Sequence, residues 1–530
     1  DGRTGRAMCR TLKMPPAALA VLCAMLAVMP ACTPAAPKPV ALRVLATPEL
    51  AGIEPILDEL RAETGIRLIM DYRGGADATN ALYPAGYQHD LAWLASERPY
   101  KLRLAASRYA GHWPLSTSIM MSPVVIGVRP TVATRLRADA GHHQLSWADM
   151  ADGAAAGTVT FAMADPHRAD SALAALVGVA TAAAGTGRAL GQDDVTCDRL
   201  RGFFSGQALT APTSEKLLDG FVGRNDIDAV IADESMLLAL NAGGRLREPL
   251  EIVYPTDGIV LSDFPLLLLA PGQRAAYDRV VAWLTRSSTQ RKIMERTLRR
   301  PIVPNVVRDP RLPTVIGNSL HYPAQQSVID TLLANYGRAT PGRVVFLLDF
   351  SGSMRGKRMA ALQSAFAGLA GEDSTSTGKF LRFHHDETFT LIKFGARTLS
   401  RRDFTIDDRQ DVDAMLDFLR SGKHSNSTAI YSALDDGYRL SARLVRDEPR
   451  RPVSIVLMTD GENNAGMSFT SFRRRYRSLP AAVRAVPTNP VGFGDARQAE
   501  LAQVARITGG RTIDATATSL REALKETRCG

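Results

Sequence analysis

A strand that ends in oxygen-bearing side chains constrains the C-terminal third of this chain more than any other feature. Val344 to Asp349 is an apolar run of the kind found in buried strands, and Ser351 and Ser353 follow it directly. From there to residue 527 the sequence alternates between helix and strand patterns, with strands expected at 380–383, 388–394, 453–459, 488–493 and 511–514. This alternation predicts a doubly wound α/β sheet, in which ligands bind at the carboxyl ends of the strands.

Two further loops add oxygen side chains to the same edge of the predicted sheet. Thr428 lies in a polar loop before a predicted helix, and Asp460 follows the strand at 453–459. The edge therefore gathers two carboxylates and three hydroxyls, a set that suits Mg²⁺, with Mn²⁺ or Ca²⁺ as alternatives. Two carboxylates only balance a divalent ion, which keeps the capacity to bind one more ligand, such as a carboxylate of a protein partner.

The order of these elements resembles the von Willebrand factor A-type (vWA) family with its metal-ion-dependent adhesion site. The positions that match are Asp349, Ser351, Ser353, Thr428 and Asp460. The resemblance covers residues 342–527 and implies that the domain binds a divalent cation and, through it, a protein partner. The alternative is that the Asp and Ser residues only cap the helix that follows them.

Residues 41–305 carry a different α/β pattern, with two lobes. A strand at 41–46, a helix at 48–64 and a strand at 66–70 open the segment, and this order implies a parallel sheet. A long strand at 118–128 leads into a second α/β unit, and an extended stretch at 252–261 leads back. Residues 301–325 are rich in proline and low in periodicity, so we expect a linker or packed connector, with bounds at 306–341.

The two-lobed segment resembles the type 2 periplasmic solute-binding proteins of bacteria. In that family a solute lies between lobes that close by hinge motion, and helix N-termini in the cleft suit anions. By position, the residues that would face the cleft are Thr47, Ser96, Ser122, Ser171 and Glu234. For each of them a helix cap, turn or strand-edge role is an equal alternative. The resemblance implies a small-molecule or anionic solute, or a degenerate cleft that binds none.

The first forty residues differ from the rest. A positively charged start precedes an apolar run at 17–29, which is too short for an ordinary membrane span and typical of a signal peptide. Ala31-Cys32 then resembles the lipobox of bacterial lipoproteins. We therefore expect a signal peptide at 1–32, lipidation of Cys32, a linker at 33–40 and an extracytoplasmic protein anchored to the membrane. Plain cleavage and an uncleaved anchor are the alternatives.

The chain carries a positive net charge. The net charge of +10 comes from arginines scattered along the chain, with no basic stretch interleaved with aromatics, so nucleic acid is not expected as a partner.

Cys197 and Cys529 are the cysteines outside the leader. Whether they pair is open, because sequence does not set the distance between them.

The whole chain resembles bacterial lipoproteins that join a substrate-binding domain to a vWA domain, and this implies binding without catalysis. A solute receptor for an ATP-binding cassette transporter is the first alternative. A metal-dependent hydrolase that uses Asp349 and Asp460 is the second. The sequence disfavours the hydrolase because no recognisable general base or second set of metal ligands accompanies the two carboxylates.

Overall fold

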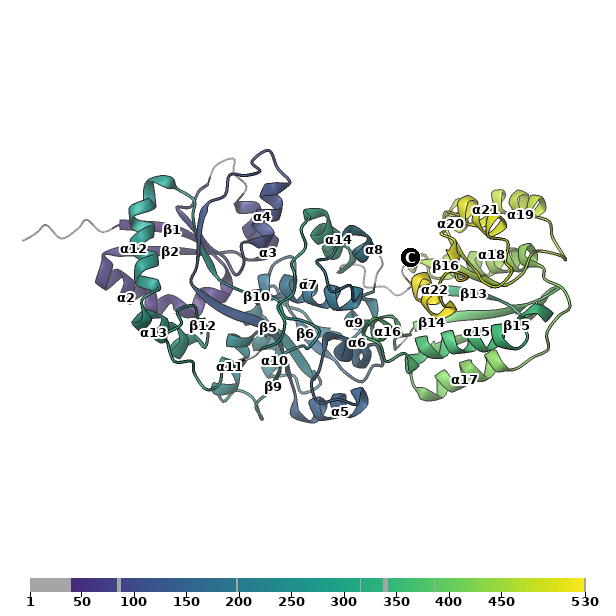
Figure 1. The fold of residues 1–530 in the computed structure, drawn as a ribbon, viewed down its shortest axis with the longest axis horizontal. Coiled ribbons are helices and arrows are strands. Elements are labelled where there is room, and N and C mark those ends of the chain that lie inside the picture. Colours follow the sequence, from purple (N-terminus) through teal and green to yellow (C-terminus); the bar gives the residue numbers. More distant parts are fainter. Residues whose placement is uncertain are drawn as a thin grey trace, which may run out of the picture.

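The computed structural model shows a two-lobed N-terminal domain followed by a separate C-terminal domain (Figure 1). It describes residues 40–82, 87–196, 199–314, 316–336, 342–385 and 387–528. The predicted signal peptide with Cys32, and also Cys197 and Cys529, lie outside these ranges. No helix within the ranges is both long enough and apolar enough to cross a membrane.

Lobe 1 is a five-stranded sheet in the order β2-β1-β3-β11-β4. β1 (Val40–Ala46) pairs in parallel with β2 (Ile66–Tyr72) and β3 (Leu91–Trp93), as the opening strand–helix–strand pattern predicts. Helix α2 (Glu54–Thr64) joins the first two strands and ends at Gly65, whose φ of 70° is the left-handed conformation of a C-cap. β11 (Pro265–Leu268) pairs antiparallel with both β3 and β4 (Leu115–Ser118).

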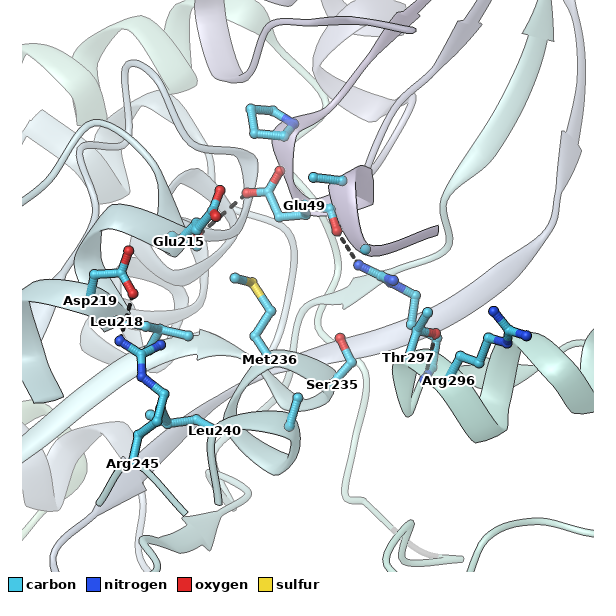
Figure 2. A pocket seen from close by; sticks show the side chains of 16 residues that line it. Glu49, Glu215, Leu218, Asp219, Ser235, Met236, Leu240, Arg245, Arg296 and Thr297 are labelled. Atoms are coloured by element: carbon cyan, nitrogen blue, oxygen red, sulfur yellow. Dashed lines mark hydrogen bonds and ion pairs between the residues drawn. The ribbon is translucent and has the colours of Figure 1, made fainter. Parts of the chain in front are cut away.

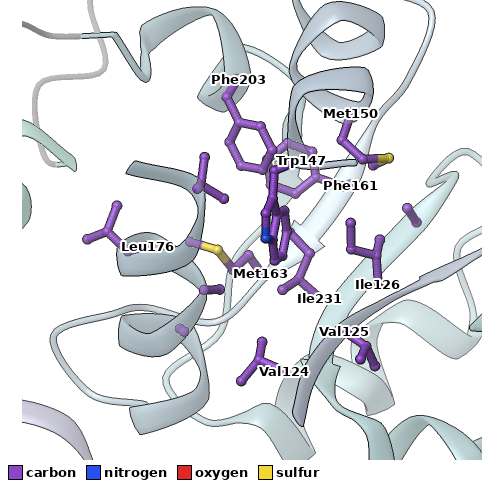
Figure 3. Close-up of a cluster of buried hydrophobic side chains, with 14 of the residues drawn as sticks. Val124, Val125, Ile126, Trp147, Met150, Phe161, Met163, Leu176, Phe203 and Ile231 are labelled. Carbon is purple, nitrogen blue, oxygen red and sulfur yellow. The ribbon is translucent and has the colours of Figure 1, made fainter. Parts of the chain in front are cut away.

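Lobe 2 is built on a sheet in the order β10-β5-β8-β6-β7, with two short strands also paired to β5. Its strands are β5 (Met120–Val128), β6 (Phe161–Met163), β7 (Gln207–Leu209), β8 (Ala229–Asp233), β9 (Glu251–Val253), β10 (Leu261–Ser262) and β12 (Arg300–Pro301). Trp147, Phe161 and Phe203 lie together in its core, with the rings of Phe161 and Phe203 4.7 Å apart (Figure 3). The prediction of two α/β lobes is therefore confirmed.

The chain crosses between the lobes three times, and the crossings pack against one another. They are β4 to β5, β10 to β11, and α13 (Ser287–Thr297) to β12. Phe264 and Leu298, at φ 41° and 56°, are the non-glycine residues of the described chain with positive φ, and each lies in a crossing. Arg299 sits over the Phe264 ring at 4.9 Å. These segments are where a hinge between the lobes would bend.

The C-terminal domain is a six-stranded sheet in the order β15-β14-β13-β16-β17-β18. The strands are β13 (Arg343–Asp349), β14 (Glu387–Phe394), β15 (Thr398–Ile406), β16 (Val453–Thr459), β17 (Thr488–Gly492) and β18 (Ile513–Asp514). All neighbours are parallel except β15, which is antiparallel to β14. The prediction of a doubly wound sheet is confirmed.

Helices cover both faces of this sheet because successive residues of a strand point to opposite sides. Phe346 and Leu348 belong to one hydrophobic core, and Val345 and Leu347 to the other. The first core is covered by α15 (Lys357–Ala367), α17 (Arg409–Arg420) and α22 (Leu520–Thr527). The second core is covered by α18 (Ile430–Asp447), α19 (Phe469–Arg477) and α21 (Gln498–Thr508).

The strand predicted at 380–383 is wrong. Ser376–Leu381 forms a helix, α16, capped by the Thr375 hydroxyl, which accepts a hydrogen bond from the backbone N–H of Gly378 at 3.1 Å. Its apolar residues are buried against the N-terminal domain rather than in a sheet, and a short apolar run does not distinguish these cases. The antiparallel edge strand β15 was not predicted.

Helix α16 is the main contact between the two domains (Figure 1). It packs on α6 (Trp147–Ala155), α7 (Asp170–Ala184) and α9 (Arg201–Phe204) of lobe 2. Phe380 is only 3% exposed and belongs to the core of lobe 2. Lys379 pairs with Asp149 at 2.6 Å, and Arg382 pairs with Asp152 at 2.7 Å.

The connector expected at 306–341 contains a helix, α14 (Gln326–Tyr336). Its residues Val328, Ile329 and Leu332 are buried against lobe 2. The chain therefore stays packed on the N-terminal domain almost to the start of the second domain.

Candidate functional site

The five oxygen-bearing residues predicted in the C-terminal domain lie at one edge of its sheet. Asp349 ends β13, Asp460 follows the neighbouring parallel strand β16, and Thr428 precedes α18. Ser353 donates a hydrogen bond to Asp460 Oδ1 at 2.8 Å, and its Oγ lies 2.9 Å from the Oγ of Ser351. The strand-end rule therefore brings residues more than a hundred positions apart into contact.

Two residues that sequence reasoning did not assign hold this group in place. Thr459 donates a hydrogen bond from Oγ1 to Asp349 Oδ2 at 2.6 Å. Asn464 accepts a hydrogen bond at 2.8 Å from the backbone N–H of Thr428, which is 3% exposed. The end of β16 thus positions the first carboxylate, and the loop after it positions the threonine.

The chemistry of this group fits a hard divalent cation. Asp349 and Asp460 are fully buried, and burial raises the pKa of Asp349 above its usual range, with the charge of Asp460 raising it further. Two buried carboxylates side by side cost free energy unless a cation balances them. Among the described residues, no three His, Cys, Asp or Glu side chains lie close enough to ligate one metal ion. The remaining donors are hydroxyls, which suit Mg²⁺ rather than a thiolate- or imidazole-bound metal.

Arg358, the second residue of the helix α15 that follows the serine loop, is a further residue of this site. Its guanidinium pairs with Asp460 Oδ2 and, at 2.7 Å, with Asp495 Oδ2. The side chain is 32% exposed, whereas that of Asp460 is fully buried. Arg358 is therefore an internal cation that offsets part of the negative charge that a metal ion would neutralise.

Replacing Arg358 with glutamine is expected to tighten Mg²⁺ binding by up to about fivefold. A pair with a partly exposed arginine contributes roughly 0.2–1 kcal/mol, and a cation that competes for Asp460 would be lost. Calorimetric titration of Mg²⁺ into the full chain measures this change. Arg355→Gln is the matched control, because this exposed arginine of the same loop carries the same charge. Weaker binding in Arg358→Gln would show instead that the arginine holds the loop in shape for the metal.

A second group of polar residues lies where the two lobes of the N-terminal domain meet. Thr47 and Glu49 come from lobe 1, at the end of β1, and the Thr47 hydroxyl donates to the Glu49 carboxylate. From lobe 2, Ser171 approaches Glu49 Oε1 at 3.4 Å and lies 2.8 Å from Ser214. The lobes also meet where the backbone N–H of Gly75 donates to Asp170 Oδ1 at 3.1 Å. The cleft is therefore closed.

The structure places the five predicted cleft residues in four settings. Thr47 and Ser171 meet around Glu49, as described above. Ser122 is fully buried and its Oγ accepts a hydrogen bond from the backbone N–H of Ser235 at 3.2 Å. The Glu234 carboxylate is already paired with Arg300, at 2.6 and 2.8 Å, and with the Tyr254 hydroxyl.

Ser96 lies outside these groups. It is half-buried, and its hydroxyl accepts a local hydrogen bond from the backbone N–H of Arg98 at 3.3 Å. A solute contact by any of the five residues stays a prediction.

The charged residues at the interface between the lobes were missed by the sequence prediction. Glu49, Asp233 and Arg299 are buried, and Asp170 is half-buried. Burial, together with the charge of Glu49, raises the pKa of Asp170 to about 7 and that of Asp233 well above its usual range. Glu49, Asp170 and Asp233 share one signal in the sequence, a position at the end of a strand or at the start of a helical segment. Arg299 lies between the end of α13 and β12 and carries no such signal.

Asp233→Asn is expected to stabilise the chain. Because burial raises its pKa in the folded state, Asp233 favours folding at low pH, and this contribution is lost as the pH rises through the folded pKa. At neutral pH, removing the buried carboxyl should raise the free energy of unfolding by about 1–3 kcal/mol. The gain should vanish toward about pH 4, the range of an unfolded aspartate.

Urea unfolding of wild type and Asp233→Asn at neutral and acid pH measures this difference. Asp278→Asn, at an exposed position paired with Arg274, is the control and should change little. An Asp233→Asn variant that is less stable than wild type at neutral pH would contradict the assignment of an unbalanced buried carboxyl.

Comparison with known proteins identifies both parts of the chain. The family model for bacterial extracellular solute-binding proteins matches residues 42–297. The family model for the von Willebrand factor type A domain matches residues 344–526. No curated protein matches the chain.

Several solved structures are similar to this chain over about half of its length. The periplasmic binding protein AfuA from Actinobacillus pleuropneumoniae is 13% identical, with 56% of this chain and 97% of that one covered and a TM-score of 0.43. Iron-bound HitA from Pseudomonas aeruginosa is 14% identical, with 57% and 99% covered and a TM-score of 0.43. The sulfate-binding protein SubI from Mycobacterium tuberculosis is 19% identical, with 50% and 88% covered and a TM-score of 0.38.

Proposed function

Because the chain joins a bacterial extracellular solute-binding domain to a von Willebrand factor type A domain, we propose that it is an extracytoplasmic binding protein with two sites. The C-terminal site holds a divalent cation, with Mg²⁺ preferred, and recruits a protein partner through it. The N-terminal cleft binds a small solute. We propose further that Cys32 carries a lipid that anchors the protein to the membrane, and that the protein acts by binding rather than by catalysis.

The observation that carries this proposal is the buried pair of carboxylates at the edge of the C-terminal sheet. Asp349 and Asp460 lie at the ends of adjacent parallel strands, the Ser353 hydroxyl donates to Asp460 and lies beside that of Ser351, and Thr428 lies close to Gly461. Such a set neutralises a divalent ion without saturating it. When bound, the cation would supply Lewis acidity toward one further oxygen ligand, and these residues would hold it at the open end of the strands.

Within this proposal each part of the site has a task. Asp349 and Asp460 supply the charge, the hydroxyls orient toward the ion, and Thr459 fixes the Asp349 carboxylate through its 2.6 Å hydrogen bond. Ser353 is exposed and therefore marks the side of the site that faces a partner.

Calorimetric titration of Mg²⁺, and separately of Mn²⁺, into the full chain tests the proposal. One saturable site per chain supports it. The absence of any saturable binding with either ion would contradict the metal-dependent part of the proposal, while leaving the solute-binding cleft to be tested by itself.

A receptor for a transport system is the second candidate function. The observation that favours it is the closed cleft, in which residues of both lobes meet around Glu49. Solute binding by the full chain with no dependence on the C-terminal metal residues would favour this candidate over partner recruitment.

A further inference from the structure

The pocket between the two lobes of the N-terminal domain has a balanced set of charges. Its volume is about 360 Å³, and the charged side chains that line it are three acids and three arginines, namely Glu49, Glu215, Asp219, Arg245, Arg296 and Arg299 (Figure 2). Asp219 and Arg245 pair with each other at 2.8 Å. This lining favours neither sign of charge in a ligand. The edge of the C-terminal sheet that carries the predicted metal ligands differs from it in this respect.

Three exposed basic residues lie on three different loops at that edge. Lys357 is the first residue of α15, four positions after Ser353. Lys423 lies in the loop between α17 and α18 that also carries Thr428. Arg397 lies in the turn between β14 and β15. We call Lys357, Arg397 and Lys423 the basic rim.

Backbone hydrogen bonds join these loops next to the predicted metal ligands. The last residue of β14 lies opposite Asp349 in the register of the sheet, so the turn after β14 is at the same edge. In that turn the backbone N–H of Ala396 donates to the Ser425 hydroxyl at 2.9 Å. The backbone N–H of Ser425 donates to the carbonyl of Phe350 at 2.9 Å. The loop with Lys423 therefore contacts both the turn with Arg397 and the loop that holds the metal-type serines.

Ion pairing differs between the cations and the acids of this edge. Within the described ranges of the chain, no residue of the basic rim forms an ion pair. The exposed acids of the same edge are both paired, Asp495 with Arg358 at 2.7 Å and Glu462 with Arg497 at 2.6 Å. The edge therefore offers positive charge to a partner, whereas its own exposed negative charge is already neutralised.

An acidic protein segment is the partner that fits this edge. The proposed metal ion takes one carboxylate, and further carboxylates beside it would meet the basic rim. Leu399, two positions after Arg397, is 40% exposed and adds an apolar contact that a protein segment uses and a layer of lipid headgroups does not. Complementary charge around a binding site speeds association and disfavours partners of the wrong charge.

We propose that the basic rim recognises an acidic protein segment, in which carboxylates on either side of the metal-bound carboxylate pair with Lys357, Arg397 and Lys423. This inference rests on the proposed recruitment of a protein partner through the divalent cation, and it names the class of that partner. The rim acts on the partner and not on the metal ion.

Three fluorescently labelled peptides of equal length test the proposal on the full chain with Mg²⁺: Gly-Glu-Glu-Glu-Gly, Gly-Gln-Glu-Gln-Gly and Gly-Gln-Gln-Gln-Gly. At low ionic strength, fluorescence anisotropy should show the first peptide binding up to about twentyfold tighter than the second, because each added exposed ion pair contributes up to about fivefold. The third peptide should not bind. High salt should remove the advantage of the first peptide, because exposed charges are screened.

The triple variant Lys357→Gln/Arg397→Gln/Lys423→Gln should bind the two glutamate peptides equally well. Its Mg²⁺ affinity, measured by calorimetry, should not fall, and its exposed positions leave the fold intact. Unchanged preference for the peptide with three glutamates in this variant would overturn the inference.

The matched control is Arg443→Gln/Arg484→Gln/Arg506→Gln. It removes the same charge from exposed positions of α18, α20 (Ala481–Arg484) and α21, outside the three loops. This variant should keep the preference for the peptide with three glutamates. Loss of the preference in the control would overturn the assignment to the rim, because net charge alone would then explain it.

The remaining outcomes separate the inference from the proposed function. Equal binding of the two glutamate peptides by wild type would overturn the inference and leave recruitment through the metal standing. Binding of the first peptide that is undiminished after Mg²⁺ is removed with EDTA would also overturn it. Binding to phosphatidylglycerol vesicles that the rim variant loses, without any preference among the peptides, would assign the rim to a membrane instead. Binding of neither glutamate peptide with Mg²⁺ present would count against both the inference and the proposed recruitment.

Discussion

Replacing Asp349 with alanine is expected to abolish saturable Mg²⁺ binding by the full chain. Asp349 is fully buried at the end of β13 and is one of only two carboxylates in the site. Its loss leaves a single carboxylate, Asp460, that Arg358 already pairs with. Losing even an outer partner of a metal ligand typically costs about 10–100-fold in affinity, so losing a charged ligand should cost at least about 100-fold. Calorimetric titration of the variant measures this loss.

The variant must be shown to be folded, because a buried residue is removed. Circular dichroism and the unfolding transition of Asp349→Ala should match those of metal-free wild type or be slightly more stable, since burial raises the pKa of Asp349 and its charge is unfavourable without a cation. Asp417→Ala, at an exposed position on α17, is the control and should bind Mg²⁺ as wild type does. Wild-type affinity in a folded Asp349→Ala would place the metal elsewhere.

The second large effect is expected at the contact between the domains. Phe380→Ala should lower the free energy of unfolding by about 3–5 kcal/mol, the usual cost of removing a buried phenylalanine side chain. Phe380 belongs to the C-terminal domain but is buried in the core of lobe 2. The cost should therefore fall on the contact between the domains rather than on either sheet.

Differential scanning calorimetry separates these possibilities. In Phe380→Ala the two domains should unfold in more widely separated transitions than in wild type, because docking no longer links them. Phe404→Ala, which truncates a 5% exposed side chain within the C-terminal domain itself, should instead lower the transition of that domain. Unchanged transitions in Phe380→Ala would mean that α16 does not couple the domains.

The predicted metal ligands of the C-terminal domain could be placed from the sequence because they follow the carboxyl ends of parallel strands. Parallel strands bring their carboxyl ends to one edge, so Asp349 and Asp460 could be placed together from the strand pattern alone. Arg358 could not, because its contact with Asp460 depends on how the start of α15 lies against the loop after β16. Thr459 could not, because its place beside Asp349 depends on the register between β13 and β16. The sequence carries no periodic signal for such contacts.

At the interface between the lobes of the N-terminal domain, the sequence pattern was a poorer guide to the individual residues. Sequence reasoning selected Glu234, but the structure pairs it with Arg300, and the neighbouring Asp233 is the residue left without a partner. Adjacent residues at the end of a strand point in different directions, so an error of one position exchanges a residue of a structural ion pair for a buried carboxylate without a hydrogen-bond partner. Helix α16 was mistaken for a strand for a related reason, since the apolar residues of a short segment do not reveal which surface buries them.

The most direct test of the central claim, a metal ion with an open position for a partner carboxylate, uses Mn²⁺ as a probe in place of Mg²⁺. Electron paramagnetic resonance counts bound Mn²⁺, and the relaxation of water protons reports whether bound Mn²⁺ still carries exchangeable water. One Mn²⁺ per chain is expected, displaced by Mg²⁺ and absent in Asp349→Ala, with a relaxation enhancement that falls when glutarate is added as a carboxylate probe. The claim would be contradicted if no Mn²⁺ binds. It would also be contradicted if Mn²⁺ binds but the relaxation enhancement of water protons does not change when glutarate is added.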